Sequence, residues 1–217
     1  MLISHKNKFI TIDIPKTATR SLRETLLPQN VIDIVGDPNF NADFYQHGTA
    51  QQCSNSLQKL NKNFSEYFSF VIVRNPWDRY YSFFKYFKEY AEKYKNRDAS
   101  IQWSAPEINQ GKLCEELFAG KTDEIVLRNI IIDNECQSDY YADENGEIMV
   151  SHIAKFENLN KEFELLCNQV NVNYFPLSHG NESIVKSSYY NTYTKETINL
   201  VAEKEKSVIE LLGYKYK

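Results

Sequence analysis

KFITIDIPKTATRSL (Lys8–Leu22) reads as a strand, a short loop and the start of a helix. The apolar run Phe9–Ile14 predicts the strand, and a helical pattern begins at Arg20. The first backbone N–H groups of a helix have no partner within it, and the helix dipole places positive charge there. The loop therefore predicts an oxyanion cradle, to which Lys16 adds a mobile charge. The hydroxyl groups near it belong to Thr17, Thr19 and Ser21.

This loop is not the Walker A phosphate loop. The Walker pattern needs glycines, and none lies between Pro15 and Leu22. An anion bound here must therefore be held in another way.

Composition sets the broad class. With 217 residues, 42% apolar and 14% aromatic, the chain predicts one folded domain over residues 1–217. A net charge of −4 gives no support for a nucleic-acid binder, so an anion site must be built locally from a few cations.

The spacing of the cysteines and the length of the apolar runs disfavour a zinc protein and a membrane protein. The four cysteines are widely separated and form no CxxC pair, which favours reduced, mostly buried thiols over a zinc site. No run approaches the ~20 apolar residues of a membrane span, and no targeting segment is visible. We therefore expect a cytoplasmic protein with no membrane span.

The rest of the chain predicts an α/β start and a helical finish. Asn145-Gly146 predicts a hairpin between Asp139–Tyr141 and Ile148–Val150. The segment 96–134 is expected to be helical in parts. Further strands are expected at Val31–Val35 and Phe70–Arg74, and further helices at Thr49–Leu60, Trp77–Tyr94, Leu159–Val170 and Thr194–Leu212.

A second anion site is predicted where the apolar strand Phe70–Arg74 meets the helix after Asn75-Pro76. Arg74 offers a planar set of donors at the strand end, and Ser82 lies on the helix that follows. The alternative is that Arg74 or Arg79 only pairs with a nearby carboxylate. Two such sites in one small α/β domain favour a ligand with two separated phosphate-like groups.

These motifs resemble those of the carbohydrate sulfotransferases, in particular bacterial members related to the Golgi carbohydrate and heparan 2-O-sulfotransferases. PKTATRSL is similar to the family's 5′-phosphosulfate loop, and VRNPWDRYYSFF to its 3′-phosphate loop. Other segments match in order and spacing. They are His47–Ala50, Gln137–Tyr140, Gly146–Ile148, Lys155–Leu159, His179–Ser183 and Gly213-Tyr214.

The resemblance implies a P-loop-like, three-layer sulfotransferase fold with a central, mostly parallel sheet flanked by helices. It also implies the donor 3′-phosphoadenosine 5′-phosphosulfate (PAPS), with 3′-phosphoadenosine 5′-phosphate (PAP) as product. Arg74 and Ser82 would bind the 3′-phosphate. The 5′-phosphosulfate would be held by Lys16, Thr17, Ala18, Thr19, Arg20 and Ser21.

Two positions depart from the family pattern. Arg20 stands where a small or hydroxyl residue is common, so it either adds a contact or points to solvent. Glu182 stands where members often carry Lys, although Lys186 is nearby as a substitute.

Sulfuryl transfer to an alcohol requires stabilisation of the leaving phosphate oxygen, removal of a proton and in-line geometry. Lys16 suits the first task, and nothing in the sequence demands a metal. His47 is the favoured general base, because imidazole is largely neutral at pH 7; the related heparan 2-O-sulfotransferases use a His in the comparable region. Glu24 and Glu157 are alternative bases.

The other histidines are assigned lesser roles. His5 is expected in a surface tail, and His152 is expected to be structural. For His179, a role in the acceptor or cofactor site and a role in a local turn both stay open.

The acceptor is predicted to be a neutral or lightly charged glycan, because the net charge disfavours a polyanion. Tyrosines at 140, 141, 189, 190 and 193 are either sugar platforms or packing residues. Two other classes remain: a catalytically silent PAP- or PAPS-binding module, and a nucleotide kinase, which the missing Walker glycines disfavour.

Overall fold

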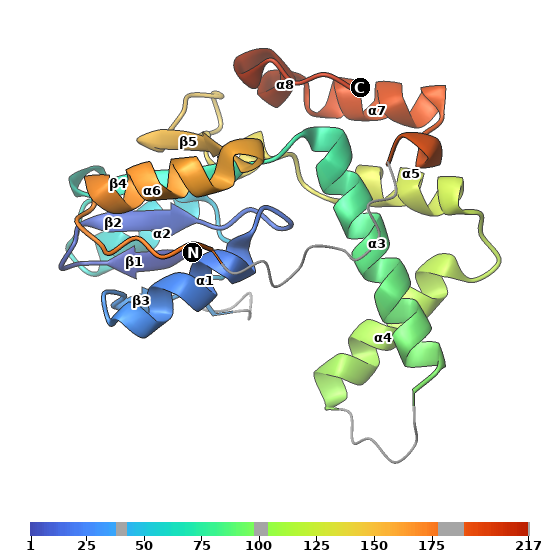
Figure 1. Cartoon of the computed structure of the whole chain (residues 1–217), viewed down its shortest axis with the longest axis horizontal. Coiled ribbons are helices and arrows are strands. Elements are labelled where there is room, and N and C mark those ends of the chain that lie inside the picture. The colour runs from blue at the N-terminus through green and yellow to red at the C-terminus, as the bar shows by residue number, and fades with distance from the viewer. Residues whose placement is uncertain (38–42, 98–103, 178–188, 217) are drawn as a thin grey trace. The chain divides into compact units, whose positions relative to one another are not determined.

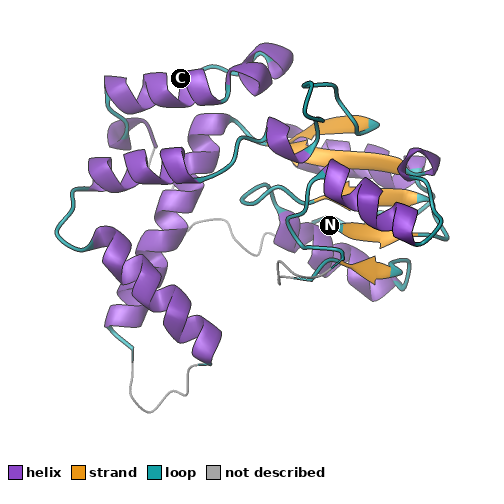
Figure 2. Ribbon diagram, turned by 180° about the vertical axis from the view of Figure 1, so that it is seen from behind, coloured by secondary structure: helices purple, strands orange, loops and turns teal. Residues whose placement is uncertain are grey.

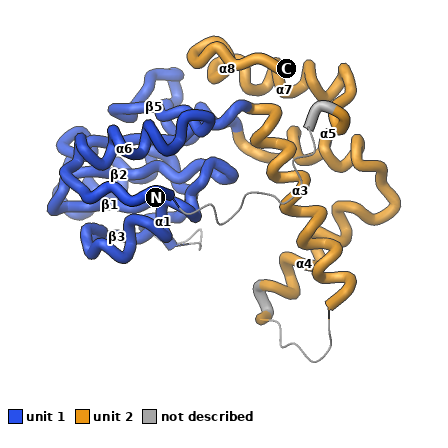
Figure 3. Tube along the Cα trace, viewed as in Figure 1, with its two compact units in different colours: residues 1–75, 136–186 blue, residues 76–135, 187–217 orange. Residues whose placement is uncertain are grey.

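The apolar run after Lys8 forms strand β2 (Phe9–Ile12), the middle strand of a five-stranded sheet in the computed structural model of the protein (Figure 1). The structure describes residues 1–37, 43–97, 104–177 and 189–216. Contacts divide the chain into two units, coloured in Figure 3: residues 1–75 with 136–186, and residues 76–135 with 187–217. The expectation of one domain over 1–217 stays a prediction.

The sheet belongs to the first unit and has the strand order β3-β1-β2-β4-β5. β2 pairs in parallel with β4 (Phe68–Val73), which pairs in parallel with β5 (His152–Lys155). β1 (Leu2–Ser4) is antiparallel both to β2 and to the short β3 (Ile34–Val35). The sheet is therefore mostly parallel, as predicted.

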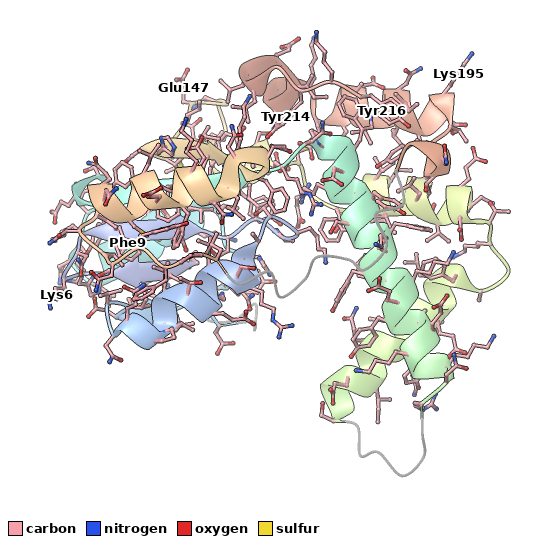
Figure 4. The ribbon with its side chains drawn as sticks, viewed as in Figure 1. Lys6, Phe9, Glu147, Lys195, Tyr214 and Tyr216 are labelled. Atoms are coloured by element: carbon pink, nitrogen blue, oxygen red, sulfur yellow. The ribbon has the colours of Figure 1, made fainter. Side chains whose placement is uncertain are left out.

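Helices cover both faces of this sheet (Figures 1 and 2). α1 (Thr19–Leu26) and α6 (Leu159–Gln169) lie on one face, and α2 (Ala50–Lys59) lies on the other. Phe9, a residue of β2 that is labelled in Figure 4, is fully buried in the core between the sheet and helices α1 and α6. The apolar side chains that share this core are Leu2, Phe9, Leu22, Leu26, Phe70, Ile72, Ala154, Phe163, Leu166, Cys167, Val170, Val172 and Leu177.

The second unit is helical. Its elements are α3 (Pro76–Lys95), α4 (Ala105–Phe118), α5 (Asp123–Asp133), α7 (Lys195–Lys204) and α8 (Lys206–Leu212). Aromatic side chains at helical spacing on α3 pack inside this unit: Tyr80 is fully buried and Phe84 is 4% exposed. Pro76 occupies the first position of α3, where its missing N–H costs nothing.

The C-terminal helical pattern breaks at one buried charge. A single helix was expected over Thr194–Leu212, but Glu205 separates α7 from α8, with φ −101° and ψ 23°. Its carboxylate is fully buried and accepts from Arg79 Nη1 at 3.1 Å and from the Tyr80 hydroxyl at 3.1 Å. Arg79 thus pairs with a carboxylate that is distant in sequence and has a structural role.

Three other expectations need correction. The predicted hairpin is reduced to a turn at Gly146 (φ 83°) and a single bridge between Ala142 and Ile148, because Ser138–Tyr140 form a 3₁₀ turn in place of a strand. The N-terminal strand β1 was not foreseen. His5 is not a surface tail: it is half-buried and its Nδ1 lies 2.8 Å from the Tyr67 hydroxyl.

The buried Arg79–Glu205 pair allows a stability prediction. Arg79→Met leaves a buried carboxylate without its cation and should lower the free energy of unfolding by about 3–5 kcal/mol. The Arg79→Met/Glu205→Leu double variant should recover most of that loss, since it removes both charges. Urea unfolding followed by tryptophan fluorescence measures this, because Trp77 is buried in the second unit.

The matched control is Arg128→Gln, which breaks the exposed pair between α5 and α7 at Glu196. Its cost should stay below about 1 kcal/mol, because exposed pairs contribute little. Equal costs for Arg79→Met and Arg128→Gln would contradict the assigned role of the buried pair.

Candidate active site

The candidate site forms at the carboxyl ends of the parallel strands in the first unit. β2, β4 and β5 run in the same direction, so the loops that follow them leave from one edge of the sheet. Ligands of open α/β sheets bind at this edge. It collects the loop after Ile12, the residues after Val73 and the turn after Lys155.

The loop after β2 adopts a backbone conformation that usually requires glycine. Lys16 has φ 71° and Ala18 has φ 67°, both in the left-handed region. Such a conformation costs a non-glycine residue roughly 1–2 kcal/mol. A left-handed residue directly before a right-handed one, as Ala18 is before α1, turns successive N–H groups toward one concave side, which is suited to an anion. The loop thus holds a positive-φ backbone at two positions without glycine.

Two threonines stabilise the conformation of this loop. The hydroxyls of Thr17 and Thr19 both donate to the carbonyl oxygen of Ile14, at 2.9 and 3.0 Å. Each hydroxyl has one proton, so neither donates to a ligand in this conformation. What these residues offer to an anion is their backbone N–H groups.

Helix α1 begins at this loop with an open N-terminus. Its N-cap is Ala18, and within the described residues no side chain caps the helix. The first turn carries no acidic residue. By contrast, Thr49 caps α2 in a capping box with Gln52. The start of α1 therefore keeps its positive potential for an anion.

Arg74 joins the second predicted motif to the first. It follows β4, and its Nη1 donates to the carbonyl of Lys16 at 3.1 Å. Its guanidinium lies over the Phe156 ring, 4.3 Å from the ring centre. The fully buried Gln137 holds its backbone at both ends, accepting from the Arg74 N–H and donating to the Arg74 carbonyl, each at 2.9 Å.

Gln137 was not assigned a role from the sequence. Its place in the segment Gln137–Tyr140, which matches the family pattern, was the available signal. Glu157 also acts at this edge, accepting from the Asn75 N–H at 2.7 Å. It therefore supports the loop after β4, which makes it a weaker candidate for the base.

His47 is anchored to the same backbone segment. Its Nδ1 lies 2.7 Å from the carbonyl oxygen of Asp13, two residues before Pro15. A carbonyl only accepts, so Nδ1 carries the proton and Nε2 is the unprotonated nitrogen of the neutral ring. Burial lowers the pKa of His47, and the hydrogen bond to Asp13 and the Asp13 charge partly oppose this. The ring is therefore neutral at pH 7 and able to accept a proton.

Other predicted residues take different places. Arg20 is exposed and its Nε donates to Glu24 at 2.6 Å, so both lie on the outer side of α1. Ser21 is half-buried on the same helix. Ser82 lies on α3 in the second unit, so its pairing with Arg74 at one phosphate stays a prediction. His152 lies in β5 with its Nε2 3.2 Å from Glu162, consistent with a structural role.

The tyrosines examined as sugar platforms are mostly packed. Tyr140 and Tyr141 are 5% and 2% exposed. Tyr193 is buried, donates to the Trp77 carbonyl at 2.7 Å, and its ring centre lies 5.7 Å from that of Tyr216 (Figure 4). The side chains of Tyr189 and Tyr190 lie outside the described structure, as do residues His179, Glu182 and Lys186.

The described residues offer neither a metal-binding cluster nor a membrane-spanning helix. Across the described residues, no three or more His, Cys, Asp and Glu side chains gather in a way that would hold a metal ion. None of the described helices combines the length and apolar character that crossing a membrane requires. Cys53, Cys114 and Cys167 are buried thiols that form no disulfide.

Comparison with known proteins identifies the class. The sulfotransferase family profile matches residues 1–217, so the chain belongs to the sulfotransferase family. No curated protein and no solved structure matches it. The family assignment supports transfer of a sulfuryl group to an acceptor, and the open N-terminus of α1 with Lys16 and Arg74 is suited to binding an anionic donor.

The state of His47 can be measured directly. In an NMR titration of the four histidine rings, the His47 midpoint should fall below the ordinary value of ~6.5, because burial disfavours the charged ring. The signal is assigned by its loss in His47→Asn, and its carbon shifts should report the Nδ1–H tautomer. In urea-unfolded protein the midpoint should return to the ordinary value; a folded midpoint at or above that value would contradict the environment described here.

Proposed function

We propose that this protein transfers the sulfuryl group of PAPS to a hydroxyl group of a carbohydrate acceptor. The observation that carries the proposal is the backbone conformation of the loop at Lys16 and Ala18. The loop holds a left-handed backbone at two non-glycine positions directly ahead of a helix N-terminus that no described side chain caps. Strain of this kind persists where the surrounding structure enforces it, and it clusters at ligand sites.

Donor binding follows from the charges at this edge of the sheet. The backbone N–H groups of Thr17–Ser21 and the Lys16 ammonium would hold the 5′-phosphosulfate. Arg74, whose backbone Gln137 fixes, would bind the 3′-phosphate. Ser82 stays a sequence-based prediction for the same phosphate. These oxyanions are matched by cations and N–H dipoles, so donor binding needs no metal.

In the proposed transfer the acceptor oxygen attacks sulfur in line with the bond to the 5′-phosphate. A new O–S bond forms, the S–O bond to phosphate breaks, and its electron pair stays on the phosphate oxygen. Lys16 and the N–H groups of α1 stabilise that developing charge. The proton of the acceptor hydroxyl passes to Nε2 of His47, and the products are a sulfate ester and PAP.

Nucleotide preference tests the donor site. Calorimetry without magnesium should show PAP binding at least about tenfold tighter than AMP, since a charge-assisted bond to the 3′-phosphate contributes about 1.5–3 kcal/mol. Arg74→Gln should remove most of that preference. Lys59→Gln, which takes one exposed cation from α2 in the same unit, should leave it intact. Equal affinity for PAP and AMP in the wild-type protein would overturn PAPS as donor.

Turnover tests the chemistry. With labelled PAPS and a panel of neutral oligosaccharides, His47→Asn should lower kcat by ~10²–10⁴-fold while the PAP Kd stays within about threefold. Asn is chosen because its amide N–H is able to replace the Nδ1 bond to Asp13. Lys16→Ala should lower kcat by ~10²–10³-fold and affect PAP affinity less.

Two outcomes would change the assignment. Unchanged turnover in His47→Asn would exclude His47 as the base. PAP binding with no transfer to the neutral panel or to heparin, tested in parallel as a polyanion, would identify a silent binding module.

A further inference from the structure

Asp13 places a buried carboxylate at the end of β2, where the strand is otherwise apolar. Its side chain is 1% exposed, and its oxygens are satisfied by three groups. Thr11 Oγ1 donates to Oδ1 at 2.8 Å. Arg23 Nη2 and Nε donate to Oδ2 at 3.1 and 3.2 Å, and the Met1 amino group lies 2.9 Å from the same oxygen. A buried charge is retained only when it is paired in this way.

The other polar group of Asp13 holds His47. Its carbonyl accepts the His47 Nδ1–H at 2.7 Å, while its carboxylate is tied to Arg23 on α1, the helix that starts at the Lys16 loop. Met1 closes the network from the other side: its amino group donates to the carbonyl of Gln46, next to His47, and its carbonyl accepts from Arg23 at 3.2 Å.

We propose that Asp13 is a positioning residue for the transfer. Clamped by Arg23 and the Met1 amino group, it fixes the carbonyl that keeps His47 in the Nδ1–H tautomer, with Nε2 left to accept the proton. The proposal rests on the proposed function of His47. It deepens that function by coupling the base to α1. Asp13, at the end of β2, holds His47 through its carbonyl and Arg23 of α1 through its carboxylate.

The charges around His47 determine in which direction each substitution should move its pKa. Burial is the main cause that lowers the His47 pKa; the Asp13 carboxylate raises it, and the Met1 ammonium and Arg23 lower it. The Tyr45 ring also meets the imidazole edge-on, at 6.4 Å between ring centres. Removing the Asp13 charge and removing the Arg23 charge should therefore move the His47 titration in opposite directions.

The test compares Asp13→Asn, Arg23→Gln and Arg20→Gln by NMR titration of the His47 ring in the absence of PAPS and acceptor. Asp13→Asn should move the midpoint down and Arg23→Gln should move it up. Arg20→Gln is the matched control, since it removes a cation from the same helix that pairs with Glu24 and not with Asp13, and it should leave the midpoint in place. The ring signal is followed directly because burial also lowers the pKa of the Met1 amino group, which titrates as well.

The kinetic arm uses labelled PAPS with the neutral oligosaccharide panel. Asp13→Asn should lower kcat by about 10–100-fold, the range seen when a group that orients a metal-binding histidine is lost, with the KM for PAPS within about threefold. If Asp13→Asn does not fold, Arg23→Gln still tests the proposal through its upward shift.

Each result decides one point. Equal midpoints in all variants, with transfer intact, would overturn the coupling of Asp13 to His47. Opposite shifts in a protein whose wild type transfers no sulfate would leave that coupling standing but overturn the proposed function, and with it the positioning role.

Discussion

The parallel pairing of β2 with β4 is the constraint on which the candidate site depends. Ile12 is opposite Val71, so β4 continues beyond the end of β2 and delivers Arg74 beside the loop that follows β2. The contact between Arg74 Nη1 and the Lys16 carbonyl results from this register. A shift of one residue would turn every side chain of β2 to the other face of the sheet, so the buried core and the site are fixed together.

Each unit contains a buried carboxylate paired with arginine, and the two pairs serve different ends. Glu205 and Arg79 lie inside the helical unit, where they join α3 to the junction of α7 and α8. Asp13 and Arg23 lie beside the loop that begins α1, and the same aspartate holds His47. Burying a charge costs several kcal/mol, so each carboxylate specifies one arrangement of the elements around it.

Local patterns predicted most of the elements. The helices expected from Thr49 and from Thr194 begin there, and the last helix ends at Leu212 as expected, because the caps at Thr49, Thr194 and Gly213 depend on neighbouring residues only. The elements that were not predicted depend on contacts with residues distant in the sequence. β1 is only three residues long and exists by pairing with β2 and β3, and the break at Glu205 depends on Arg79, 126 residues away in sequence.

By itself, the sequence determined the class of protein and the α/β order of elements, and it predicted two anion-binding motifs at Lys16 and Arg74, because these are carried by residue types at fixed spacing. Only the tertiary structure decided how they are held. The Gln137 clamp on Arg74 and the hydrogen bond from His47 to the Asp13 carbonyl depend on contacts between segments that are far apart in the chain. Such contacts leave no periodic trace in the sequence, since each is a single pair of groups brought together by the packing of the sheet and its helices.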